Sequence, residues 1–201
     1  IIPPFYDDAE NFKSGLAVVG ENGKYGVINR SGKMVVPLMY NEIGDFSDGM
    51  AVAFDGNRFG YINRNGTVVL PFQYESASEF HNKRAICQLN GLYGMIDDSG
   101  DSIVPFLFDF MEWHSKDLVK VSKNNLYGII KRDGSPLLDI SYDEIGQFAG
   151  KRAIVMKNNR MGFVDTTGQV VIPIRYEIYN NVMINSQFIS GYSVLRSKTK
   201  F

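Results

Sequence analysis

The stretch that decides the fold of this chain is Asn22-Gly23-Lys24-Tyr25-Gly26-Val27-Ile28-Asn29, which returns in altered form every 34 residues. Its inner glycine recurs as Gly60, Gly94, Gly128 and Gly162. A second glycine column lies six residues further on, at Gly32, Gly66, Gly100, Gly134 and Gly168. Self-similarity at one fixed period indicates an array of small structural repeats. The chain therefore contains five tandem copies, with partial copies at its ends.

Each copy contains three short runs rich in Val, Ile and aromatic residues, and none is long enough for a typical helix. In the first copy Asn22-Gly23 separates the first two runs, and this pair is typical of a two-residue type I′ hairpin with positive φ at both positions. The next turn ends in Gly32, which favours a three-residue hairpin whose last residue is left-handed. Each copy is therefore predicted to be a three-stranded antiparallel meander, with residues 41–46 as a loop to the next copy.

The middle run of each copy is apolar on neighbouring positions, as at Val27 and Ile28. Because adjacent residues of a strand face opposite sides, both faces of this strand must be covered. A single three-stranded unit cannot cover them, so neighbouring units are expected to stack. We interpret the inner glycine column as a close approach, in which an aromatic ring from the next unit, for example one of the column that begins with Tyr40, packs on the glycine.

The predicted fold class is all-β, with tandem 34-residue three-stranded meanders, five copies plus partial ends, in an open superhelical array. A closed five-bladed, propeller-like ring is the alternative, although three strands are few for a blade. We expect a single domain over residues 1–201. Its units span about 15–48, 49–82, 83–116, 117–150 and 151–184, and residues 185–201 form a C-terminal cap in which 188–195 are able to add one strand.

The composition of the chain argues against several classes of function. The chain has 21 basic and 22 acidic residues and a formal charge of −1, which argues against general nucleic-acid binding. No run of 18 apolar residues is present, so no membrane insertion is expected. One cysteine and two histidines are too few for a cysteine zinc cage or a three-histidine site. We therefore expect no cofactor and no metal.

These repeats resemble the bacterial WG (or KWG) β-repeat family. That family's unit carries Asn-Gly, a Lys-aromatic-Gly-aliphatic-Ile-Asp/Asn stretch, and a later Phe-x-x-Gly-x-Ala. Residues 22–29 and 46–51 match both parts, and the resemblance covers about residues 1–176. Tyr, Phe or Met stands where the name-giving Trp is expected, as at Tyr25 and Met161. The resemblance implies a repeat that binds partners, in bacterial proteins that are often associated with the envelope or secreted.

Few residues suggest chemistry. His81 and Cys87 lie six residues apart, and a buried thiol near a loop imidazole explains them as well as a catalytic pair does. An acidic or amide residue follows the aromatic column in every copy, at Asp7, Asn41, Glu75, Asp109, Asp143 and Glu177. This column is either a calcium ladder or glycosidase pair, or a set of side chains that accept backbone N–H bonds in the following turn. Its recurrence in every copy favours the turn interpretation.

The repeat breaks between the third and fourth copies. His114 replaces the phenylalanine of a column that contains Phe46, Phe80 and Phe148, and the single tryptophan, Trp113, precedes it. Departures from a local pattern are expected at functional sites. We predict a ligand-binding patch at Phe110, Trp113 and His114. The competing interpretation is that Trp113 packs inward in place of the missing phenylalanine.

The leading functional hypothesis is a non-enzymatic repeat module that binds a protein, peptide or glycan partner or acts as a scaffold. The alternative is an accessory or regulatory segment of an enzyme whose catalytic part lies outside this chain. The feature that separates them is a non-repeated cluster of convergent polar groups, which the sequence pattern does not reveal.

Overall fold

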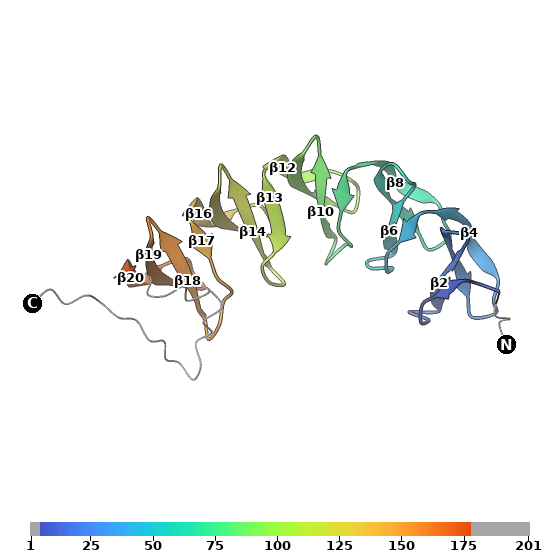
Figure 1. Cartoon of the computed structure of the whole chain (residues 1–201), viewed down its shortest axis with the longest axis horizontal. Helices are drawn as coiled ribbons and strands as arrows, with labels where there is room; N and C mark the ends of the chain where they lie inside the picture. The colour runs from blue at the N-terminus through green and yellow to red at the C-terminus, as the bar shows by residue number, and fades with distance from the viewer. Residues whose placement is uncertain (1–4, 178–201) are drawn as a thin grey trace, which may run out of the picture. The chain divides into compact units, whose positions relative to one another are not determined.

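The computed structural model describes residues 5–177, which form twenty β-strands and no helix. The strands group into five antiparallel sheets of four strands, each in simple meander order (Figure 1). The all-β class and the repeat are thereby confirmed. The predicted units ending at 184 and the cap at 185–201 extend into residues outside the described ones.

The sheets are numbered here in chain order. Sheet 1 contains β1 (Asp8–Ala9), β2 (Leu16–Glu21), β3 (Lys24–Asn29) and β4 (Met34–Tyr40). Sheet 2 contains β5 (Glu42–Ile43), β6 (Met50–Phe54), β7 (Phe59–Asn63) and β8 (Val68–Tyr74). Sheet 3 contains β9 (Ser76–Ala77), β10 (Arg84–Leu89), β11 (Leu92–Asp97) and β12 (Ser102–Phe108). Sheet 4 contains β13 (Phe110–Trp113), β14 (Leu118–Lys123), β15 (Leu126–Lys131) and β16 (Pro136–Tyr142). Sheet 5 contains β17 (Glu144–Ile145), β18 (Arg152–Lys157), β19 (Arg160–Asp165) and β20 (Val170–Glu177).

The prediction of three strands per unit was wrong, because a short first strand completes each sheet. In sheet 2 this strand is β5, where Glu42 pairs with Phe54 and Ile43 pairs with Ala53. We expected these residues to lie in a loop, because two residues are too few to show the alternation of apolar and polar side chains that is typical of a strand. Four strands in meander order are also the strand content of a propeller blade.

The inner glycine column makes room for a bulge within its own sheet, not for a ring from the next unit. Between β3 and β4, Tyr25 pairs with Tyr40 but Val27 pairs with Val36, so β4 carries extra residues opposite Gly26. A Cβ atom on Gly26 would lie 2.5 Å from the carbonyl oxygen of Val36. Because a bulge frees its residues from the hydrogen-bond ladder, it also accepts Pro37.

The turn predictions are confirmed with one variation. Asn22 and Gly23 have φ values of 52° and 71°, as a type I′ turn requires. In sheet 2 only Gly56 of the Gly56-Asn57 pair has positive φ, which fits a type II′ turn instead. All five glycines of the second column have positive φ, between 81° and 88°.

Within each of the two compact parts of the chain, the core lies between neighbouring sheets, as the stacking prediction required. The chain divides into two compact units, residues 1–107 and 108–201. In the first unit Val27 and Val36 of sheet 1 pack with Ala51 and Ile62 of sheet 2. In the second unit Ile129 of sheet 4 packs in the same core as residues of sheet 5, including Ile145, Ala153 and Val164.

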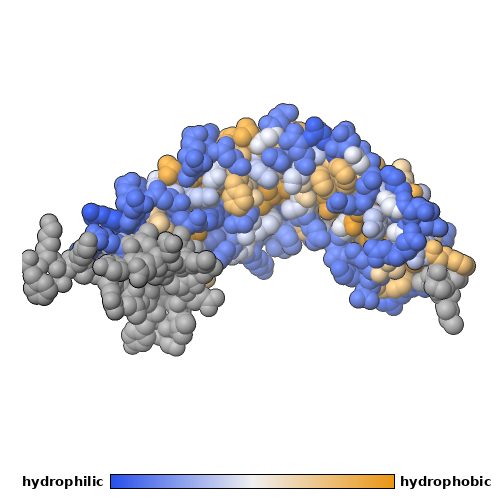
Figure 2. Space-filling view, viewed as in Figure 1, coloured by the Kyte–Doolittle hydropathy of each residue, from blue (hydrophilic) through white to orange (hydrophobic). Residues whose placement is uncertain are grey.

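Hydrophilic residues cover most of the face seen in Figure 2, and hydrophobic residues show there as separate patches. The large apolar side chains that stay exposed include Met39, Val68 and Val170 on the fourth strands. None of the described residues forms a helix long and apolar enough to cross a membrane.

Replacing Gly66 by Val should destabilise the protein by about 1–3 kcal/mol, because a β-branched residue is strained at the observed φ of +82°. The added side chain would also meet Val36, whose Cγ2 lies 3.2 Å from the position of a Cβ on Gly66. Equilibrium denaturation measures the loss. Thr67→Val, at an exposed neighbouring position, is the control. A Gly66→Val protein as stable as the parent would contradict the turn assignment.

Candidate functional site

The carboxylates of the acidic column accept hydrogen bonds from backbone N–H groups of turns, but not of the turns that directly follow them in the sequence. The Asp7 carboxylate accepts a hydrogen bond from the backbone N–H of Asn22 at 2.8 Å. Asn22 lies in the hairpin turn between β2 and β3. The same bond joins Glu75 to Gly91, Asp109 to Asn124 and Asp143 to Asn159. Each acid therefore ties the chain just before a short first strand to the hairpin of the same sheet. The side chains accept backbone N–H bonds as expected, although in a later turn.

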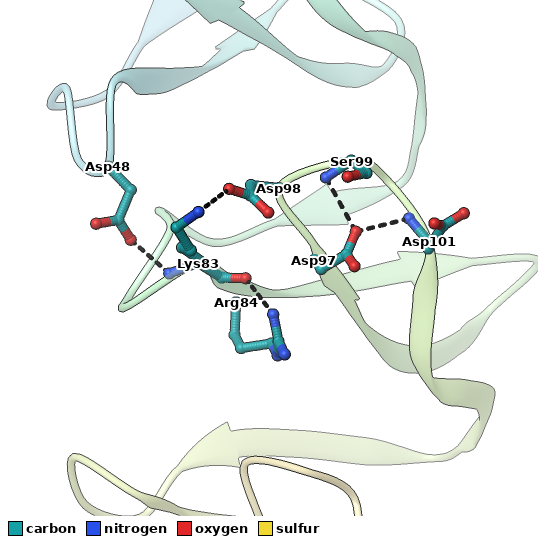
Figure 3. A network of polar contacts seen from close by, with 7 residues as sticks. All are labelled: Asp48, Lys83, Arg84, Asp97, Asp98, Ser99 and Asp101. Carbon is teal, nitrogen blue, oxygen red and sulfur yellow. Dashed lines mark hydrogen bonds and ion pairs between the residues drawn. The ribbon is translucent and has the colours of Figure 1, made fainter.

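A second group of carboxylates gathers around Lys83 in the first unit (Figure 3). The Lys83 backbone N–H donates to Asp48 at 2.7 Å, and its ammonium group pairs with Asp98 at 3.0 Å. The Asp97 carboxylate accepts from the backbone N–H groups of Ser99 and Asp101. The Asp48 carboxylate thus links loops of sheets 2 and 3, whereas those of Asp97 and Asp98 bond within sheet 3. Within residues 5–177 no group of three or more His, Cys, Asp or Glu side chains is placed to hold a metal ion.

Cys87 is a buried thiol of sheet 3. Its sulfur lies 3.4 Å from the hydroxyl oxygen of Tyr61, and burial raises the pKa of the Cys87 thiol to about 12. His81 lies in an exposed loop. Because the thiolate is the reactive form of cysteine, Cys87 is protonated and unreactive at neutral pH. The structural interpretation of this residue therefore fits its surroundings.

The three residues of the predicted binding patch take different environments. Phe110, at the start of β13, is 37% exposed, Trp113 is half-buried, and His114 is 5% exposed. The His114 ring meets the Phe148 ring edge-on, with 5.6 Å between their centroids. His114 thus occupies the interior place of the missing phenylalanine, and Phe110 lies at the surface. A ligand-binding role for Phe110, Trp113 and His114 stays a prediction.

Close to His114 lies a buried lysine that the sequence analysis missed. Lys120 of β14 forms an ion pair with Glu144 of β17, and its ammonium lies 4.5 Å from the centroid of the Tyr127 ring. The signal was available, because Lys120 stands in a column that is otherwise apolar: Val18, Val52, Ile86 and Ile154. Burial, and secondarily the positive charge of Lys120, lowers the pKa of His114 below its usual value.

The first unit contains an open groove of about 540 Å³ at the short-strand edge of sheets 1 and 2. Three of its lining residues, Asp8, Glu10 and Glu42, are exposed acids. Aromatic rings also line it, among them Phe54 and Phe59, whose centroids lie 4.7 Å apart. The remaining lining residues are Val18, Tyr25, Asn41, Ile43, Gly44, Val52, Ala53 and Ala77. Sequence reasoning missed this groove because it treated β1 and β5 as loop.

Replacing His114 by Phe should stabilise the protein by about 1 kcal/mol at pH 7, because it removes two buried ring nitrogens that accept or donate no hydrogen bond in the described structure. The gain should grow as the pH falls below about 6.5. Below this pH His114 becomes protonated in the unfolded chain, whereas in the folded protein its lowered pKa keeps it neutral. The parent protein therefore loses stability as the pH falls.

Denaturant titrations between pH 5 and 8 measure this difference. His81→Gln, at the exposed histidine, is the control and should change the pH slope much less. A parallel pH dependence in the parent and in His114→Phe would contradict the buried, neutral assignment of His114.

Several solved structures are similar to this chain at low sequence identity. A eukaryotic initiation factor matches with a TM-score of 0.50 at 12% identity, over 86% of this chain and 56% of that one. Hsv2 from Kluyveromyces lactis matches with a TM-score of 0.48 at 10% identity, over 96% of this chain and 68% of that one. Hsv2 from Kluyveromyces marxianus matches with a TM-score of 0.47 at 9% identity, over 79% and 57%. This chain therefore spans little more than half the length of two of these structures.

No curated protein matches the sequence. The profile of the WG containing repeat matches it six times, at residues 1–25, 25–58, 59–93, 93–127, 127–160 and 161–181. These matches follow the repeat that the glycine columns and the five sheets describe. The chain belongs to the WG repeat family.

Proposed function

We propose that this chain is a non-enzymatic repeat module that binds an extended segment of a protein partner in the groove at the short-strand edge of sheets 1 and 2. The observation that carries the proposal is the groove itself. Its volume is within the range of ligand sites, and its lining combines apolar and aromatic side chains with exposed acidic ones. It also lies beside β1 and β5, the edge strands of their sheets, where an extended chain can approach the backbone.

Several observations favour binding over catalysis. The Cys87 thiol is protonated at neutral pH, and the column carboxylates of Asp7, Glu75, Asp109 and Asp143 accept backbone N–H bonds. A general acid or base needs a free proton-transfer site beside its substrate. These groups instead support turns and packing, which suits a scaffold.

The open array is part of this proposal. Each of the five sheets takes its four strands from consecutive residues, so the described chain exchanges no strand between its first and last sheets. Each sheet does, however, have the four strands of a propeller blade, so the number of strands does not argue against a ring.

Small-angle X-ray scattering tests the arrangement. A compact chain of this length has a radius of gyration of about 16–17 Å. An open array should exceed that value clearly, whereas a closed ring should approach it. A radius of gyration near the compact value, measured on monomeric protein, would contradict the open array and favour the ring.

Selection of a displayed dodecapeptide library on the purified protein tests the binding function. A selected peptide, titrated into isotope-labelled protein, should shift backbone amide signals at Tyr25, Glu42, Phe54 and Phe59. Phe59→Ala should weaken binding about tenfold, because aromatic residues commonly dominate binding energy. Isothermal titration calorimetry measures the affinity.

Phe110→Ala tests the competing surface. Shifts confined to Phe110 and Trp113, together with a loss of affinity in Phe110→Ala, would move the site to the patch predicted from the sequence. A library that yields no peptide for the groove would contradict the proposed function.

A further inference from the structure

The second unit contains a built site for a lysine side chain. The Lys120 ammonium pairs with the Glu144 carboxylate and lies over the Tyr127 ring. Its side chain is only 11% exposed, so both contacts form largely away from water. A carboxylate and an aromatic face together are a favourable environment for an ammonium group.

The repeat places the same two kinds of residue at equivalent positions in the first unit. Three repeats before Tyr127 and Glu144 stand Tyr25 and Glu42, and Val18 stands in the place of Lys120. All three of these residues line the open groove. Valine is too short and too apolar to reach the carboxylate. The junction of sheets 1 and 2 therefore retains the acid and the ring, and it lacks the lysine.

The charges of the groove agree with this comparison. Asp8, Glu10 and Glu42 are exposed acids, and none of them forms an ion pair with another of residues 5–177. No lining residue carries a positive charge, although the ammonium group of Lys24 donates to the lining Asn41 at 2.9 Å. At the next junction Ser76 replaces the acid, so the combination is specific to sheets 1 and 2 within the first unit.

We infer that the groove takes a lysine side chain of a peptide partner, with Glu42 and Tyr25 as its direct contacts and Asp8 and Glu10 as a surrounding negative field. This inference rests on the proposed peptide-binding function and names the residue that the groove recognises. The groove continues past these contacts to Phe59 and Ala77. A flanking stretch of peptide fills that length, whereas a free amine does not.

The test uses an end-blocked hexalysine peptide and its fully Nε-acetylated form. Hexalysine should displace the library-selected peptide from the groove, and the acetylated form should do so at least tenfold less well, because acetylation removes the positive charge. Glu42→Gln should weaken hexalysine binding at least fivefold. The affinity should also fall as salt is raised.

Val18→Lys is the sharpest variant, because it should place a lysine of the chain itself in the site and so reduce hexalysine binding at least tenfold. Leu126→Lys adds the same charge on the exposed surface of the second unit, and Asp101→Asn removes one acid outside the groove. Both controls should bind hexalysine within twofold of the parent. Thermal melting of each variant shows whether it is folded, and Glu42→Gln keeps the test decisive if Val18→Lys is not.

Each outcome separates this inference from the function on which it rests. If a selected peptide maps to the groove but hexalysine does not displace it, the lysine assignment is overturned and peptide binding stands. Hexalysine binding by Glu42→Gln and Val18→Lys that equals the parent's would also overturn it, and an equal loss in Leu126→Lys and Asp101→Asn would show a non-specific charge effect and overturn it as well. Spermidine that competes as well as hexalysine would overturn the peptide part. If no peptide maps to the groove, the proposed function itself fails.

Discussion

The need to cover both faces of every middle strand governs this structure. Tyr61 and Ile62 are adjacent in β7, face opposite sides of sheet 2, and are both buried, Ile62 against residues of sheet 1 and Tyr61 against residues of sheet 3. One small sheet cannot shield both sides from water, so its neighbours must do so. Within each compact unit, neighbouring sheets therefore stack with the core between them.

Stacking also requires that each sheet keep the same local shape, and the glycines provide it. Gly26 allows the bulged strand β4 to come close to β3, and the positive φ of Gly32 closes the turn between them. The carboxylate of Asp7 then holds the short first strand to the hairpin of its own sheet. These contacts recur with the repeat period, which explains why their residues form columns in the sequence.

The repeats differ from one another most where a column of similar residues is interrupted. Lys120 and His114 replace apolar residues at the junction of sheets 4 and 5, and they bring an ion pair and an imidazole into a core that is otherwise apolar. The corresponding junction of sheets 1 and 2 keeps Val18 and opens into a groove.

The period, the turns and the apolar strands could be predicted from the sequence, because glycine conformation and strand alternation are local properties. The short first strand of each sheet could not be predicted, since Glu42 and Ile43, for example, form β5 only through pairing with β6. Phe110, Trp113 and His114 were recognisable as a break in the pattern, but their different burial depends on which face each meets. The groove and the Lys120–Glu144 pair join residues from neighbouring sheets. Such sites depend on stacking, so only the tertiary structure brings their residues together.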